Sequence, residues 1–187
     1  MEMTKCLILV DNSNVFIEGK KLSARRKGVL PQVGETKGPQ DPSWRLDFGE
    51  LLTFMANGRD IIDAILVGSE PPQNDSVWAS AKQRGFRVLT FSRSFSGEEK
   101  EVDTEIATQA AEIILLNKDQ PGVLALASGD RDFLPSVRLA HRWKWTVEMY
   151  AFVSAFNPNG QMAMSVDDIR KLDDAFDRIG RNGFEWP

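Results

Sequence analysis

Two clusters of acidic and amide side chains directly follow two short apolar runs. Leu7–Val10 leads into Asp11-Asn12-Ser13-Asn14, and Val123–Ala127 leads into Ser128-Gly129-Asp130-Arg131-Asp132. Short runs that are apolar throughout are typical of parallel strands buried on both faces. Ligands of parallel α/β sheets bind beyond the carboxyl ends of the strands. Both clusters are therefore expected where a ligand would bind.

Helix capping is a competing interpretation of these clusters, because Asp, Asn and Ser accept hydrogen bonds from the free N–H groups at a helix start. Asn14 or its neighbour Ser13 can cap a helix that starts just after them. Asp132 can cap a helix that starts one residue later. Asp11 and Asp130 lie upstream of these positions, so we expect that capping does not account for them.

A third acidic segment opens the longest predicted helix, Val102–Leu116. Asp103 falls on the same helix face as Ile106 and Ala110, whereas Glu101 falls on a stripe that faces solvent. A carboxylate on an apolar face is unfavourable unless it is paired or bound to a metal ion. Asp103 is therefore a third candidate for the site at the strand ends.

Four carboxylates are thus expected to converge at one crevice: Asp11, Asp103, Asp130 and Asp132. Carboxylates in close quarters repel one another and stay ionised only with a compensating cation. Because the chain has a single histidine, His141, and a single cysteine, Cys6, the ligands must be mainly oxygen atoms. Such ligands select Mg²⁺ or Mn²⁺, and these ions activate water and stabilise the oxygens of a phosphodiester during cleavage.

The elements that would position these residues alternate between strands and helices. Five apolar runs are predicted as strands: Leu7–Val10, Ile61–Val67, Arg87–Phe91, Val123–Ala127 and Thr146–Ala151. Amphipathic stretches predict helices near Val15–Arg25, Asp47–Ala56, Ser76–Gln83, Val102–Leu116, Phe133–Arg142 and Val166–Phe176. This alternation predicts an α/β protein with a central, mainly parallel sheet of five or six strands and helices on both faces.

The length and composition are those of one globular domain. The chain has 187 residues, of which 42% are hydrophobic and 27% charged. We expect a single domain over residues 1–180, with a flap at about 20–45, and a mobile tail at 181–187. No apolar run approaches the roughly 20 residues of a membrane span, and the first residues lack a secretory leader. We therefore expect a soluble, cytoplasmic protein without a membrane partner.

The flap is basic although the whole chain has a net charge of −4. Residues 20–45 hold seven Lys and Arg residues against two acids, a local charge of +5. Basic surfaces of this kind bind the phosphates of nucleic acids. Five residues on and just after the first predicted helix are expected to contact phosphate: Lys20, Lys21, Arg25, Arg26 and Lys27.

Three segments resemble, in order and spacing, the signatures of the NYN domain family, a branch of the PIN-like nucleases. They are Leu7–Asn14, Lys100–Asp103 at the start of a helix, and Ser128–Phe133. The similarity extends over approximately residues 5–151. It implies a Rossmann-like, PIN-type three-layer α/β/α sandwich with the activity of a metal-dependent ribonuclease on single-stranded or structured RNA, and it leaves a homodimer open.

The resemblance also implies roles for individual residues. Asp11, Asp103, Asp130 and Asp132 match the acidic residues of a Mg²⁺ or Mn²⁺ site. Asn14 matches a catalytic amide near the first Asp, and Ser128 matches a small hydroxyl residue that would contact substrate.

The helix signature departs from the family at two positions, and these leave alternatives open. Glu101 replaces a usual glycine, and Gln109 stands where the family usually has a further Asp. One or two metal ions are therefore compatible with the sequence. A catalytically weak or inactive PIN-like domain that binds RNA or a protein is the alternative function. A dinucleotide-binding oxidoreductase would need a glycine-rich loop after the first strand, and a haloacid-dehalogenase-like phosphatase would need an Asp in place of Ser13.

Overall fold

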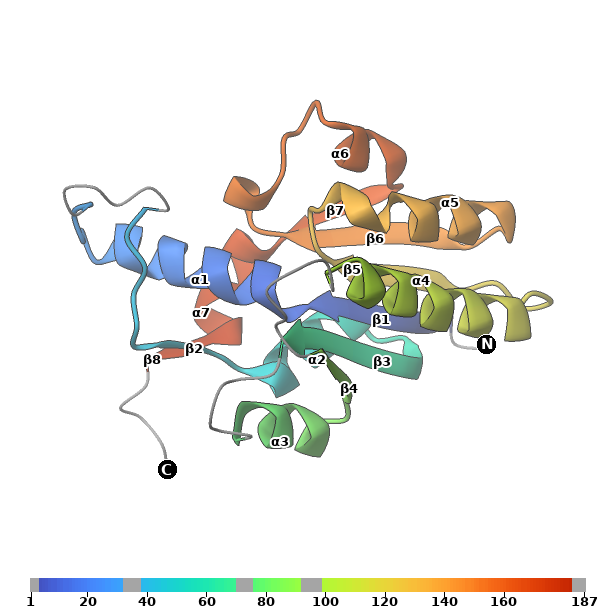
Figure 1. Cartoon of the computed structure of the whole chain (residues 1–187), viewed down its shortest axis with the longest axis horizontal. Helices are drawn as coiled ribbons and strands as arrows, with labels where there is room; N and C mark the ends of the chain where they lie inside the picture. The colour runs from blue at the N-terminus through green and yellow to red at the C-terminus, as the bar shows by residue number, and fades with distance from the viewer. Residues whose placement is uncertain (1–3, 32–37, 70–75, 92–98, 183–187) are drawn as a thin grey trace.

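A six-stranded sheet forms the centre of the protein, which the computed structural model describes over residues 4–31, 38–69, 76–91 and 99–182. At residues 69, 91, 99–105 and 182 only the backbone is described. The strands of this sheet are β1 (Lys5–Asp11), β3 (Asp60–Ser69), β4 (Arg87–Phe91), β5 (Val123–Ala127), β6 (Thr146–Ala151) and β7 (Asp168–Lys171). They lie in the order β4-β3-β1-β5-β6-β7 (Figure 1). Every neighbouring pair is parallel, which confirms the predicted α/β class and the mainly parallel sheet.

The strand order changes direction at β1. From β1 the chain builds outward to β3 and β4, and then it returns to the other side of β1 to form β5, β6 and β7. Such a reversal leaves a crevice beyond the carboxyl ends of the two central strands, where ligands of open parallel sheets bind. The residues that follow β1 and β5 therefore border this crevice.

Helices cover both faces of the sheet and complete the expected three layers. One face carries α1 (Asn12–Arg26), α2 (Phe48–Ala56), α3 (Ser76–Gln83) and α7 (Phe176–Ile179), which share one buried cluster with the sheet. The opposite face carries α4 (Glu99–Leu116), α5 (Leu134–Arg142) and α6 (Gln161–Ser165), which share a second cluster. Three short 3-10 helices, η1 (Arg131–Phe133), η2 (Val153–Ala155) and η3 (Leu172–Ala175), connect these elements.

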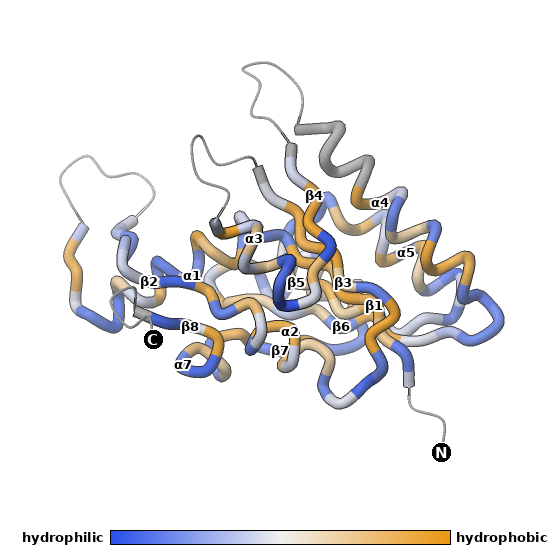
Figure 2. The backbone as a smooth tube through the Cα atoms, turned by 90° about the horizontal axis from the view of Figure 1, so that it is seen from below, coloured by the Kyte–Doolittle hydropathy of each residue, from blue (hydrophilic) through white to orange (hydrophobic). Residues whose placement is uncertain are grey.

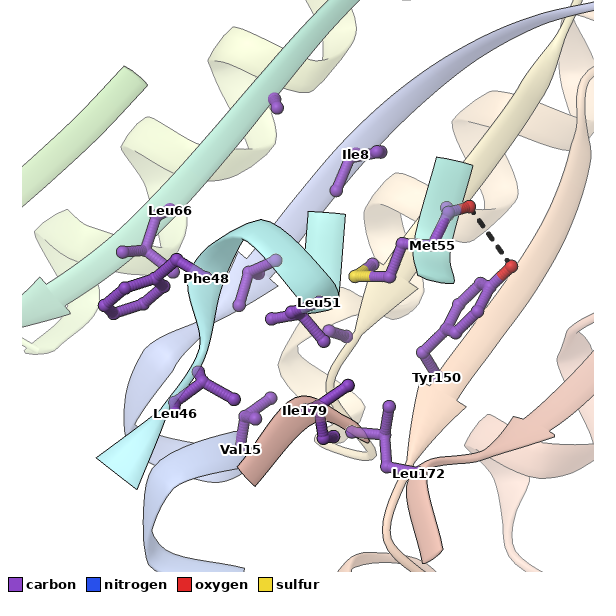
Figure 3. Close-up of a cluster of buried hydrophobic side chains, with 14 of the residues drawn as sticks. Ile8, Val15, Leu46, Phe48, Leu51, Met55, Leu66, Tyr150, Leu172 and Ile179 are labelled. Atoms are coloured by element: carbon purple, nitrogen blue, oxygen red, sulfur yellow. Dashed lines mark hydrogen bonds between the residues drawn. The ribbon is translucent and has the colours of Figure 1, made fainter. Parts of the chain in front are cut away.

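Both faces of the central strands are apolar. Cys6, Ile8 and Val10 of β1 pack into the cluster on the α1 side, whereas Leu7 and Leu9 pack into the other cluster. Figure 2 shows β1 and β3 as hydrophobic segments, in contrast to the more hydrophilic α1. Figure 3 shows how side chains from α1, α2, the sheet and the C-terminal region fill the α1-side cluster. Burial on both faces is typical of the strands of a parallel sheet that helices cover on both sides.

A small antiparallel sheet holds the end of the basic flap. Its strands are β2 (Trp44–Leu46) and β8 (Gly180–Asn182). The buried Trp44 ring packs so closely on α1 and β8 that a Cβ added at Gly19 or Gly180 would overlap it. The predicted mobility of the tail is therefore wrong for residues 181 and 182, because they pair with β2, while residues 183–187 lie outside the described residues.

The predicted C-terminal helix over residues 166–176 is wrong. Asp168–Lys171 instead extends the sheet as β7, with Met149 of β6 opposite Ile169. The five predicted strands are present, and the start of α1 differs as described below. No helix in the described residues is long and apolar enough to cross a membrane.

Candidate active site

Asp11 is the last residue of β1 and the N-cap of α1. Its Oδ1 atom accepts a hydrogen bond of 3.1 Å from the backbone N–H of Asn14. The helix begins at Asn12 instead of Val15, so the expectation that capping does not account for Asp11 is wrong. The reason is that Asn and Ser fit the first turn of a helix, where the backbone N–H groups have no partner within the helix.

Ser128 connects Asp11 to the loop after β5. The serine is fully buried, and its hydroxyl lies 3.3 Å from Asp11 Oδ2, to which it donates. The same Oγ atom accepts a hydrogen bond of 3.1 Å from the backbone N–H of Asp130. The two neighbouring strand ends are thus joined through one side chain that contacts both acidic residues.

Asp130 and Asp132 are exposed at the start of η1. Asp130 is the N-cap of η1, and its Oδ1 atom accepts a hydrogen bond of 3.1 Å from the N–H of Asp132. The expectation that Asp130 lies outside the capping positions is therefore also wrong. For both Asp11 and Asp130, however, the capping bonds involve only one of the two carboxylate oxygens.

The surroundings of Asp11 disfavour its negative charge. Burial raises the pKa of Asp11, and the negative charge of Asp130 raises it further, although the hydrogen bonds from Asn14 and Ser128 act in the opposite direction. A bound cation would relieve both the desolvation and the repulsion. Ionised Asp11 is therefore held in an environment that does not balance its charge.

The predicted convergence of all four carboxylates remains a prediction. Among the described residues, no group of three or more His, Cys, Asp or Glu could hold a metal ion. The backbone of Asp103 lies in α4, which packs against β1 and η1, but its side chain is outside the described part. One turn later, Ile106 is buried in the same cluster as Phe133 of η1.

Asn12 is a residue that the sequence did not single out. Its Oδ1 atom is buried and has no hydrogen-bond partner among the described residues. Asn14, which the sequence favoured, contributes its backbone N–H to the contact with Asp11. Both amides follow Asp11 in the sequence and both residues are partly buried. The buried, unpartnered Oδ1 atom of Asn12 distinguishes the two in the structure.

Gln109 does not face an open ligand position. Its Oε1 atom accepts a hydrogen bond of 2.7 Å from Arg87 Nη1, and Arg87 also forms an ion pair of 2.6 Å with Asp63. Arg87 is the first residue of β4, at the opposite end of that strand from the crevice. Gln109 therefore ties α4 to the β3–β4 side of the sheet.

The basic residues of the flap divide into paired and unpaired groups. Three of them form ion pairs: Lys21 with Glu18 at 2.7 Å, Arg26 with Asp177 at 2.8 Å, and Lys27 with Asp41 at 2.6 Å. Lys20 lies over the Phe16 ring, with 4.2 Å from Nζ to the centroid, and Arg25 is exposed. Lys20 is partly buried, which lowers its pKa, and Asp41 attracts its charge. Neither Lys20 nor Arg25 forms an ion pair among the described residues, so an added phosphate would not have to displace a bonded carboxylate from either of them.

The fold and the strand-end carboxylates define an α/β protein with a candidate acidic site at the point where the strand order reverses. Residues 5–173 match the model of the NYN domain, and the chain belongs to that family. NYN domains are part of the PIN-like nuclease superfamily.

The solved structures include a similar fold of undetermined function. A protein of unknown function from Vibrio parahaemolyticus, VPA0982, is 19% identical in sequence, with a TM-score of 0.66. The similarity covers 92% of this chain and 95% of that one. The comparison with curated proteins gives no match. At this identity the structural neighbour supports the fold alone.

Proposed function

We propose that this protein is a Mg²⁺- or Mn²⁺-dependent ribonuclease that hydrolyses internal phosphodiester bonds of single-stranded or structured RNA. The observation that carries the proposal is the link from Asp11 through Ser128 to Asp130 at the carboxyl ends of β1 and β5. Membership of a family within the PIN-like nucleases supports the same chemistry.

The donor set fits a hard divalent cation. The groups around the crevice offer oxygen atoms, the burial of Asp11 leaves its charge poorly compensated, and Asn12 adds a buried amide oxygen without a partner among the described residues. Four carboxylates would hold the ion: Asp11, Asp103, Asp130 and Asp132. When bound, such an ion lowers the pKa of water and offsets charge on the phosphodiester oxygens.

The other residues would position the carboxylates and the substrate. Ser128 and the backbone N–H of Asn14 hold the two oxygens of Asp11 in fixed directions. Lys20 and Arg25 would contact phosphates of the RNA directly. Lys21, Arg26 and Lys27 would have to exchange a carboxylate partner for a phosphate, which weakens their net contribution.

Cleavage of a labelled single-stranded RNA and a labelled RNA hairpin tests the proposal. We expect cleavage with Mg²⁺ or Mn²⁺, none with EDTA, and a loss of at least about a hundredfold in Asp130→Asn, since each 1.4 kcal/mol of lost charge stabilisation is roughly a factor of ten. Asn remains a good N-cap, so the fold is kept. Asp168→Asn, which changes an exposed carboxylate paired with Arg170 on β7, is the matched control.

The possible outcomes separate the two candidate functions. Cleavage that survives EDTA, or an unimpaired Asp130→Asn protein, would refute the metal-dependent mechanism. Binding of RNA by a wild-type protein that cleaves neither substrate would favour a binding module instead.

A further inference from the structure

Glu18 is a buried carboxylate of α1 that the proposed chemistry does not use. It lies seven residues after Asp11, about two helical turns away, and is only 9% exposed. Its Oε1 atom accepts a hydrogen bond of 2.7 Å from Lys21, and its Oε2 atom accepts one of 2.6 Å from the hydroxyl of Ser154. A carboxylate this deeply buried is unfavourable unless it is bonded in this way.

The bond to Ser154 anchors η2, the short helix that follows β6, to α1. The Ser154 hydroxyl fixes the middle of η2 to Glu18. At its start, the backbone N–H of Val153 donates a hydrogen bond of 2.7 Å to Asp173 Oδ2. Because η2 is only three residues long, these two side-chain contacts hold most of it in place.

The end of η2 is in direct contact with the loop that carries Asp130. A Cβ atom added at Gly129 would lie 2.6 Å from the carbonyl oxygen of Ala155 and 3.0 Å from Phe156 Cβ. The two backbones therefore touch, and only glycine fits between Ser128 and Asp130. A shift of η2 would move this loop, because interiors packed this closely transmit displacement.

We propose that Glu18 is a positioning residue which, through Ser154 and η2, sets the position of the Ser128–Asp130 loop relative to Asp11. The contacts run without interruption from Glu18 to Ser154, and from Ala155 to Gly129. Glu18 touches neither RNA nor metal ion in this role. One consequence rests on the proposed function: loss of the contact between Glu18 and Ser154 should weaken metal binding by Asp11 and Asp130.

Backbone amide exchange tests the mechanical part of the proposal independently of activity. The N–H of Asp130 is bonded to Ser128 Oγ, and the N–H of Asp132 is bonded to Asp130 Oδ1. In Ser154→Ala we expect both amides to exchange faster than in the wild type. Glu18→Ala should do the same, whereas Glu18→Gln should keep most of the protection because its amide can still bond to the Ser154 hydroxyl.

Titration calorimetry with Mn²⁺ tests the consequence for the site. We expect Ser154→Ala to weaken Mn²⁺ binding by about tenfold, the lower end of what loss of an outer contact of a metal site costs. Tyr150→Phe is the control for general destabilisation. Tyr150 lies on β6, four residues before Ser154, and its hydroxyl bonds to Glu148 and to the backbone carbonyl of Met55 in α2. It should leave Mn²⁺ affinity and both amides unchanged.

Each outcome decides the proposal. Unchanged exchange at Asp130 and Asp132 in Ser154→Ala, or an increase that Tyr150→Phe reproduces, would overturn it. Faster amide exchange in Ser154→Ala and Glu18→Ala, but not in Tyr150→Phe, would support the positioning role. If the wild-type protein at the same time binds no Mn²⁺, the metal-dependent function would be refuted. An increase in exchange with unchanged Mn²⁺ affinity would overturn the link to the site.

Discussion

Replacement of Ser128 by Ala removes a side chain that contacts both Asp11 and Asp130. Two hydrogen bonds are lost, one to a carboxylate and one from a backbone N–H. A bond to a charged group contributes about 1.5–3 kcal/mol to the free energy of unfolding, and a neutral bond about 0.5–1.5 kcal/mol. The Oγ to Oδ2 distance of 3.3 Å is long for a hydroxyl donor, so we expect a total loss of about 2–3 kcal/mol.

The pKa of Asp11 should change together with stability. The hydroxyl of Ser128 lowers the pKa of Asp11, against burial and the charge of Asp130. Ser128→Ala should therefore raise the pKa of Asp11 further, so that a smaller fraction of the protein holds an ionised carboxylate at a given pH. We expect cleavage at saturating RNA to fall by about tenfold or more, because the contacts that orient metal ligands typically have this effect.

Urea unfolding and cleavage rates, measured on the same preparations, check this prediction. Ser23→Ala is the matched control, because Ser23 is also buried and donates a hydrogen bond of 2.5 Å to the buried carboxylate of Asp41, remote from the crevice. It should lower stability comparably and leave cleavage at saturating RNA unchanged. The reasoning would be refuted if the unfolding free energy of Ser128→Ala lay within about 0.5 kcal/mol of the wild-type value, because ordinary surface substitutions have effects of this size.

Three further predictions follow from the charges of the molecule. Because the folded-state pKa of Asp11 is raised, this carboxyl lowers the free energy of unfolding as the pH rises above its unfolded value of about 4, and the full loss is reached above the folded-state pKa. Asp11→Asn, which keeps the N-cap, should raise the unfolding free energy at pH 7 by roughly 0.5–2 kcal/mol. Near pH 3 the variant and the wild type should be equally stable, and a variant that is still more stable at pH 3 would contradict the prediction. Burial alone would raise the pKa of Asp41, but its bonds to Lys27 and two serines outweigh burial and lower it. Stability from Asp41 is therefore present above about pH 4, its unfolded value, and lost below it, so the difference in unfolding free energy between wild type and Asp41→Asn should narrow on acidification in urea titrations. In fluorescence anisotropy on an Asp130→Asn background, Lys20→Ala with Arg25→Ala should shallow the slope of log affinity against log salt by up to about 1.4, and Arg26→Ala should change it less.

The sequence was most informative where side chains are buried on both faces of an element. The bounds of β5 coincide with the predicted strand, because Val123–Ala127 is a continuous apolar run that is buried throughout, and such a run has few alternatives in a parallel sheet. The bounds of β4 and β6 also coincide with the prediction, although these two strands contain polar residues. β7 was missed since Asp168–Lys171 contains a single apolar residue, Ile169. β7 is stabilised by its pairing with β6, and the local sequence pattern does not predict this pairing.

The candidate site was predicted less completely than the fold. The positions of Asp11 and Asp130 at the ends of two strands follow from the sequence, because both strands could be predicted. The pairing of these strands, β1 with β5, is known only from the structure. The bridging contact of Ser128 and the buried oxygen of Asn12 could not be predicted, because they depend on which atoms the folded chain brings within hydrogen-bond distance. The ion pair of Lys21 with Glu18, in contrast, has a sequence signal, because an acidic and a basic residue three positions apart share one helix face.

Capping and metal binding are not alternatives for Asp11. One oxygen, Oδ1, accepts from the first turn of α1, and the other, Oδ2, accepts from Ser128 at the end of β5. The capping bond fixes the carboxylate at the carboxyl end of β1. In the proposed metal site this would favour binding, because an oxygen that is already fixed would need no reorganisation. Asn can replace the cap but not the charge. Substitution of Asp11 or Asp130 by Asn therefore separates the two roles, since it should preserve the helix start while it removes the charge that a divalent cation needs.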